Sequence, residues 1–205
     1  MKIGIIGAGN VGRALATAGV RAGHAITITS TTIEEAESVA AQVGVRAAPS
    51  NRAAVAEAET VILAVPFDAV KTITEELGTA LDGKILIDVT NRFTPEQLDG
   101  PSNAELIQGM APNARVVKAF NTILAAHQVD PISDSIQLDG FVAGDDAAAK
   151  QQVLDLVRSL GFRPIDAGSL AMARALEGMA TLNISLNMNQ GWPWQSGWKL
   201  LGPTG

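Results

Sequence analysis

Residues 3–12 of the chain read IGIIGAGNVG, an apolar run followed by three glycines in G-x-G-x-x-G spacing. This stretch predicts a buried strand, a sharp turn and the start of a helix. Gly7 permits the turn, Gly9 lets a pyrophosphate approach the backbone, and Gly12 allows the helix to pack closely on the strand. The N–H groups at the start of such a helix face anions, helped by the helix dipole. The stretch therefore predicts a dinucleotide-binding site, and the alternative is a glycine-rich turn in an unrelated α/β protein.

The following sequence alternates between strand and helix patterns, which predicts a doubly wound, Rossmann-like parallel sheet of α/β class. Strands are expected at 3–6, 25–29, 45–47, 60–65, 84–88 and 116–120, with helices at 10–22, 33–42, 51–58, 104–109 and between residue 68 and about residue 81. Later strands are expected at 140–143 and 163–166, and later helices at 145–160 and 169–188. We therefore expect a dinucleotide-binding domain over 1–130. A small helical C-terminal subdomain over 131–205 should contact the acceptor and a second protomer, forming one compact unit with the first part.

Composition narrows the class of protein. The 205 residues are 47% hydrophobic, carry a net charge of −6 and include no cysteine and only two histidines. A general polyanion-binding surface is therefore not expected, and neither is a disulfide, a thiolate nucleophile or a metal site. No apolar run has the length of a membrane span, and the N-terminus lacks the pattern of a signal peptide. We expect a cytoplasmic protein with no nucleic-acid or membrane partner.

The end of the second strand bears on the choice of dinucleotide. NAD sites usually carry a carboxylate there, which binds the ribose 2′-hydroxyl. This chain instead has Ser30, Thr31 and Thr32, whose hydroxyl groups can donate to a 2′-phosphate. No Arg follows, and carboxylates stand at positions 34 and 35. The pattern favours NADP, with the alternative that Ser30 caps the second helix.

Few residues are candidates for chemistry. Asn121 and Thr122 follow the sixth strand at its carboxyl end, where α/β sheets bind ligands, and are expected either to orient a substrate or to cap a turn. His127 either faces the same cleft or is a surface histidine. Asp145 and Asp146 resemble a catalytic carboxylate pair, but their place before an apolar helical stripe favours a cap of the next helix. We nominate no catalytic residue, because hydride transfer depends mainly on positioning.

Four motifs carry a family resemblance: GAGNVG at 7–12, VVKAFNTI at 116–123, AGDD at 143–146 and RPIDAGSL at 163–170. Together they resemble the NADPH-dependent F420 reductases (F420:NADP oxidoreductases), with the reductase domain of membrane ferric reductases as a wider relative. The resemblance implies a single Rossmann-like domain with a small C-terminal part, and a homodimer that transfers a hydride between NADPH and the deazaflavin coenzyme F420.

The resemblance also implies cofactor contacts. These are Ala8, Gly9, Asn10 and Val11 at the phosphates, Ser30 and Thr31 at the adenosine ribose, and Ala126 near the nicotinamide. Val65 and Pro66 end a strand that should pass the cofactor. Members of the family often have Arg after the Ser at position 30 and a Lys a few residues later, where this chain has Thr31 and Glu35.

The C-terminal region is apolar and aromatic. The expected helix at 169–188 is apolar over much of its circumference, which predicts burial on more than one side and a second protomer as the cover. All three tryptophans, Trp192, Trp194 and Trp198, follow it. Trp192 and Trp194 are expected to wall the acceptor ring or to anchor the interface.

We therefore expect an oxidoreductase that uses NADPH and a deazaflavin (F420) or flavin-like acceptor. One alternative is an NADPH-dependent reductase of another small acceptor, such as a quinone, carbonyl compound or ferric chelate. The other is a dinucleotide-sensing regulatory module without turnover.

Overall fold

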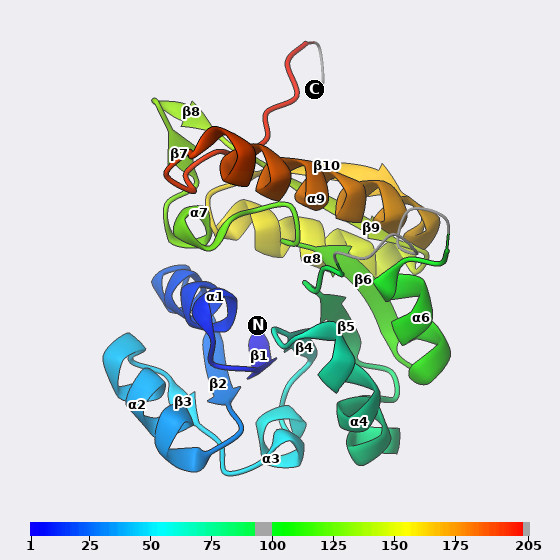
Figure 1. Ribbon diagram of the computed structural model, residues 1–205. Helices are drawn as coiled ribbons and strands as arrows, with labels where there is room; N and C mark the ends of the chain where they lie inside the picture. Colours follow the sequence, from blue (N-terminus) through cyan, green and yellow to red (C-terminus); the bar gives the residue numbers. More distant parts are fainter. Residues whose placement is uncertain (93–99, 203–205) are drawn as a thin grey trace.

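An eight-stranded sheet forms the centre of the protein (Figure 1). The structure is a computed structural model and describes residues 1–92 and 100–202. The strands are β1 (Lys2–Ile6), β2 (Ala25–Thr29), β3 (Arg46–Ala47), β4 (Thr60–Leu63), β5 (Ile85–Asp88), β6 (Arg115–Ala119), β9 (Asp139–Gly144) and β10 (Arg163–Gly168), in the order β10-β9-β6-β5-β4-β1-β2-β3. A separate hairpin pairs β7 (Ile132–Ser133) with β8 (Ile136–Gln137).

Strands β1 to β6 are all parallel, and their order is that of the Rossmann fold. Strand β9 pairs antiparallel with β6, and β10 pairs parallel with β9. The expected doubly wound, Rossmann-like sheet is confirmed, and two strands of reversed direction extend it at one edge.

Helices cover both faces of the sheet. They are α1 (Asn10–Arg21), α2 (Ile33–Val43), α3 (Asn51–Val55), α4 (Phe67–Leu77), α6 (Asn103–Met110), α7 (Ala125–Val129), α8 (Ala147–Ser159) and α9 (Ala173–Gln190), with 3₁₀ turns η1 (Gly78–Leu81) and η2 (Leu170–Met172). None of the described helices is long and apolar enough to cross a membrane.

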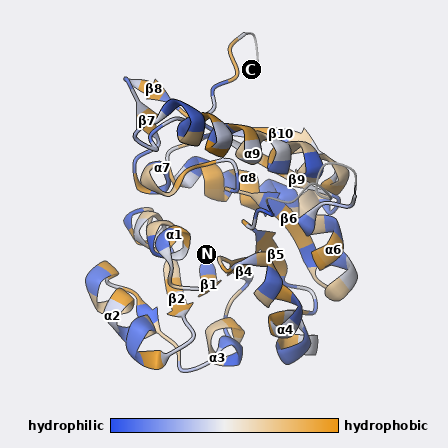
Figure 2. Ribbon diagram, viewed as in Figure 1, coloured by the Kyte–Doolittle hydropathy of each residue, from blue (hydrophilic) through white to orange (hydrophobic). Residues whose placement is uncertain are grey.

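Each face of the sheet has its own apolar core because side chains alternate along each strand. Ile3 and Ile5 of β1 belong to the core beneath α1, α2 and α8. Ile6, on the other face, belongs to the core beneath α3, α4 and α6. Figure 2 shows the corresponding pattern in the helices, since α2 and α4 carry both hydrophilic and hydrophobic stretches.

The start of α2 settles one alternative for Ser30. The helix is capped by Thr32, whose Oγ1 accepts a hydrogen bond from the backbone N–H of Glu35 at 3.3 Å. The interpretation of Ser30 as the cap of this helix is therefore wrong, and its hydroxyl has another partner.

The C-terminal part continues the main sheet through β9 and β10, so the division at residue 130 stays a prediction. The last long helix, α9, begins at Ala173, after η2. Its buried side includes Leu176 and Ala180, while Leu182 and Met188 are 51% and 68% exposed. Within one chain α9 is thus buried on one side, and its cover on the other side stays a prediction.

Candidate functional site

The turn between β1 and α1 has the geometry predicted from its glycines. Gly7 has φ +108°, and a Cβ there would lie 2.2 Å from the carbonyl oxygen of Ala64. A Cβ on Gly12 would lie 1.9 Å from the carbonyl oxygen of Gly7, so helix and turn pack too closely for any side chain. A Cβ on Gly9 would meet nothing within 4 Å. The backbone at Gly9 is therefore open to a ligand at the N-terminus of α1.

A hollow of about 530 Å³ lies beside this turn, at the carboxyl ends of β1, β2 and β4. Of the residues predicted for the cofactor site, seven line it: Gly7, Ala8, Gly9, Ser30, Thr31, Val65 and Pro66. The other lining residues are Ile6, Glu35, Asn51, Ala64, Ala69, Thr72, Ile73 and Glu76. Asn10 and Val11 form the first turn of α1, and Thr32 caps α2. We call this hollow the glycine-loop pocket.

Charge in the glycine-loop pocket is negative. The Oγ of Ser30 donates to Oε2 of Glu35 at 2.6 Å, and the Oγ1 of Thr31 lies 3.5 Å from the same oxygen. Glu76 accepts from the side-chain amide of Asn51 at 2.8 Å. The lining residues that the structure describes include these two carboxylates and neither Lys nor Arg. The sequence did not predict that the Glu35 side chain lies against the glycine-loop pocket, because this depends on the angle at which α2 follows β2.

The carboxyl end of β6 presents two buried polar side chains, Asn121 and Thr122, which are 6% and 2% exposed. Asn121 donates through Nδ2 to Oδ1 of Asn91 at 3.1 Å, and Asn91 donates to the carbonyl oxygen of Asn121 at 3.0 Å. Asn121 Oδ1 and Thr122 Oγ1 have no hydrogen-bond partner among the described residues. Neither atom therefore accepts the backbone hydrogen bond expected of a turn cap.

Backbone strain occurs at the same point. Phe120 has φ +63°, a conformation unfavourable for a bulky residue, and its ring is buried. Its carbonyl oxygen accepts a hydrogen bond from Nε2 of Gln128 at 3.0 Å. Strain of this kind costs about 1–3 kcal/mol and persists where surrounding contacts enforce it. Here it directs the chain from β6 into the segment that carries Asn121 and Thr122.

A buried ionic cluster lies behind these strand ends. Lys118 of β6 is fully buried, and its Nζ donates to Asp88 Oδ2 at 2.8 Å, to the carbonyl oxygen of Thr90 at 2.6 Å and to Glu177 Oε1 at 2.8 Å. Glu177, on α9, also accepts from the backbone N–H of Asn103 at 2.9 Å. Burial raises the pKa of the Glu177 carboxyl group, although Lys118 opposes the change. The cluster ties α9 and the start of α6 to the sheet.

The sequence offered one signal for this cluster, a lysine inside an otherwise apolar strand, and we assigned it no role. The cap interpretation is confirmed for Asp146, whose Oδ1 accepts a hydrogen bond from the N–H of Ala149 at 2.7 Å. It is wrong for Asp145, whose Oδ1 instead accepts from the backbone N–H of Leu170 at 2.8 Å. Over the described ranges, no three His, Asp or Glu side chains are placed to hold a metal ion.

The segment after α9 packs against α7 (Figure 1). His127 of α7 is only 7% exposed, with Nδ1 2.9 Å from the carbonyl oxygen of Asp130 and Nε2 2.6 Å from that of Gln195. The interpretation as a surface histidine is wrong, because the C-terminal segment covers the ring. Trp192 and Trp194 are 44% and 46% exposed and are not among the residues that line the glycine-loop pocket. Their roles stay predictions.

Ala126 also lies on α7, and it is exposed. Helix α7 packs against α1, the helix that the glycine turn opens. Ala126 therefore belongs to an element beside the glycine turn, although it does not line the glycine-loop pocket.

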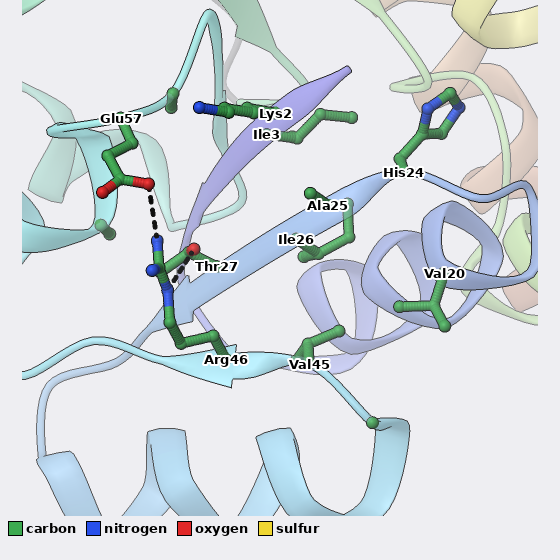
Figure 3. Close-up of a pocket in the computed structure, with 13 residues that line it drawn as sticks. Lys2, Ile3, Val20, His24, Ala25, Ile26, Thr27, Val45, Arg46 and Glu57 are labelled. Carbon is green, nitrogen blue, oxygen red and sulfur yellow. Dashed lines mark hydrogen bonds and ion pairs between the residues drawn. The ribbon is translucent and has the colours of Figure 1, made fainter.

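A second hollow, of about 350 Å³, lies at the amino ends of β1 and β2 (Figure 3). The glycine turn lies at the opposite, carboxyl end of β1. Arg46 lines this hollow; it forms an ion pair with Glu57 at 3.7 Å and donates a hydrogen bond from Nε to Thr27 Oγ1 at 3.1 Å. Burial and the nearby N-terminal ammonium group lower the pKa of His24, which also lines this hollow. The position of this hollow excludes it from the candidate site.

Comparisons with known proteins agree with the geometry. Residues 2–92 match a family model described as NADP oxidoreductase, coenzyme F420-dependent. The chain is 31% identical over 210 residues to the F420-dependent NADP reductase of Methanothermobacter marburgensis, covering 92% of this chain and 93% of the relative. A crystal structure of a putative F420-dependent NADP-reductase from Arthrobacter sp. FB24 has a TM-score of 0.85 and 32% identity, covering 93% of this chain and 95% of that one.

A second group of relatives is longer. The chain is 36% identical over 181 residues to metalloreductase STEAP3 of Rattus norvegicus, covering 86% of this chain but 36% of the relative. It thus spans about a third of the length of that metalloreductase. The identity to the Methanothermobacter marburgensis reductase, by contrast, extends over nearly the whole of both proteins. The chain belongs to the family of F420-dependent NADP reductases, which are NADP-dependent oxidoreductases with a Rossmann-like fold.

Proposed function

We propose that this protein transfers a hydride between NADPH and the deazaflavin F420 or a flavin-like acceptor. The observation that carries the proposal is the open backbone at Gly9, which faces the space beside the glycine turn where a pyrophosphate would bind. Family membership supports the same dinucleotide and the same class of acceptor.

We propose one role for each group of residues, taken from the carboxyl end of β1 to the helix α7. The N–H groups at the start of α1, from Asn10 and Val11, bind the pyrophosphate with Ala8 and Gly9. Ser30 and Thr31 lie at the adenosine ribose, supported by the cap residue Thr32. Val65 and Pro66 border the path that the dinucleotide would follow from β1 towards β6. Ala126 of α7 lies near the nicotinamide.

Asn121 and Thr122 are proposed to orient the nicotinamide carboxamide or the acceptor. Strand β6 lies two places from β4, or about 10 Å at ordinary strand spacing, so the end of β6 is within reach of an extended dinucleotide. Asn121 Oδ1, which has no hydrogen-bond partner within residues 1–92 and 100–202, is a suitable acceptor for an amide N–H group. A buried polar atom left without a partner is costly, and a ligand that supplies one recovers that cost.

The reaction needs little from acidic or basic side chains. Bound NADPH would supply the hydride, and the deazaflavin would accept it together with one proton from solvent. The protein contributes mainly by holding the two rings in contact, since positioning supplies much of the acceleration. Trp192 and Trp194 are proposed to bind the acceptor, or a second protomer in a cytoplasmic homodimer.

The test is an anaerobic assay of NADPH oxidation, monitored at the nicotinamide absorbance band, with F420, FMN, menadione and ferric citrate as separate acceptors. We expect turnover with F420 or FMN. Turnover with ferric citrate alone would instead favour a ferric reductase, a second candidate supported by the 36% identity to metalloreductase STEAP3. Tight NADPH binding without turnover of any acceptor would contradict both and favour a dinucleotide-sensing module.

A further inference from the structure

We propose that Glu35 sets the dinucleotide preference of this protein, so that the 2′-phosphate of NADPH adds no affinity and NADH binds equally well. The inference rests on the proposed function, because it concerns the adenosine-ribose end of the same site. It identifies a specificity-determining residue and adds NADH to the substrates.

The direction of the Glu35 side chain is the first observation. Glu35 lines the glycine-loop pocket, and its Oε2 accepts a hydrogen bond from the Ser30 hydroxyl at 2.6 Å. The Ser30 hydroxyl therefore donates its one hydrogen bond to Glu35 and does not donate to a phosphate oxygen. Thr31 points its hydroxyl towards the same carboxylate oxygen, at 3.5 Å.

The charge of the pocket is the second observation. Glu76 is the other ionisable side chain in the described lining, and it too is a carboxylate. A 2′-phosphate would add negative charge beside Glu35 with no lining Lys or Arg to offset it. Like charges held close together repel, and the specific recognition of phosphate normally uses Arg or Lys.

A ribose 2′-hydroxyl suits the same arrangement. A carboxylate accepts several hydrogen bonds, so Glu35 can hold the Ser30 hydroxyl and still accept from the ribose. A carboxylate near the end of the second strand performs this role in many NAD sites. In this chain the carboxylate comes from the first turn of α2 and reaches back to Ser30.

The test is calorimetric binding of NADH and NADPH to three proteins: wild type, Glu35→Gln and Glu34→Gln. Gln keeps the size of the side chain and its bond to Ser30 but removes the charge. Glu34 is the matched control, because it is exposed, adjacent on α2 and absent from the pocket lining. Measuring binding rather than turnover makes the result independent of the acceptor.

We expect wild type to bind NADPH no more tightly than NADH. We expect Glu35→Gln to raise the NADPH-to-NADH affinity ratio about tenfold, or about 1.4 kcal/mol, and Glu34→Gln to leave it near the wild-type value. Rising salt should also raise the ratio in wild type, because salt screens the repulsion, and should raise it less in Glu35→Gln, where Glu76 is the remaining carboxylate of the described lining.

A wild-type preference for NADPH of about tenfold or more would overturn the inference, as would an equal effect of Glu34→Gln. Failure of both dinucleotides to bind the folded wild-type protein would instead overturn the proposed function. The two failures are therefore distinguishable in one experiment.

Discussion

Replacing Lys118 by Met tests the buried ionic cluster. The ammonium group is fully buried and makes three hydrogen bonds of 2.6–2.8 Å, to Asp88, Glu177 and the carbonyl oxygen of Thr90. Met keeps an unbranched side chain that is shorter by the terminal Nζ atom, and it leaves two buried carboxylates without the Lys118 cation. Removing one partner of a buried ion pair costs about 3–5 kcal/mol, a large share of the roughly 5–15 kcal/mol that stabilises most domains.

The change is measured as the free energy of unfolding in urea. Lys71→Met is the matched control, because Lys71 pairs with Glu75 at 3.9 Å on the surface, with both side chains more than 65% exposed. Such a pair contributes about 0.3–0.5 kcal/mol. Adding Glu177→Gln to Lys118→Met should recover part of the loss, since it removes one uncompensated charge. A Lys118→Met protein as stable as the Lys71→Met control would refute the reasoning.

Three further predictions follow from single residues. Gly9→Val places a branched side chain in the space beside the glycine turn and should abolish NADPH binding in calorimetry while the fold is largely kept. Retained affinity in the folded variant would contradict the proposed phosphate site. Burial raises the pKa of the Glu177 carboxyl group above its unfolded value of about 4.3. The wild-type protein should therefore lose stability relative to Glu177→Gln as pH rises through the folded pKa. A difference between their urea midpoints that does not change with pH would refute this. Burial opposes ionisation of Asp139, but hydrogen bonds from Arg163, a backbone N–H and Lys199 outweigh burial and lower the pKa of this carboxyl group. The stability that the ionised Asp139 contributes to the fold should therefore be lost as pH falls through the folded pKa. Asp139→Asn should cost about 1.5–3 kcal/mol and expose the C-terminal segment to limited proteolysis, and an equally resistant variant would count against that role.

The glycine turn was predictable because its requirements are local. The positive φ of Gly7 and the close packing of Gly12 both follow from a strand, a turn and a helix within ten residues. The alternation of apolar strands and amphipathic helices similarly indicated that β1 to β6 form a parallel sheet.

Contacts between distant segments were not predictable. The burial of His127 depends on Gln195, 68 residues away in the chain, and Lys118 meets Glu177 across 59 residues. The reversed direction of β9 depends on how the chain returns to the edge of the sheet, which no local pattern encodes. Glu35 lies only five residues from Ser30, but its direction depends on the angle at which α2 leaves β2.

Isotope transfer tests the central claim most directly. The protein is incubated without oxygen with F420 and NADPH that carries deuterium on one or the other face of the nicotinamide C4, and the reduced deazaflavin is analysed by mass spectrometry. A single binding geometry predicts that one of the two labelled forms delivers its deuterium to the acceptor and the other retains it in NADP. NADPH that stays unoxidised, or deuterium that appears in water with neither form labelling the acceptor, would contradict direct hydride transfer in this site.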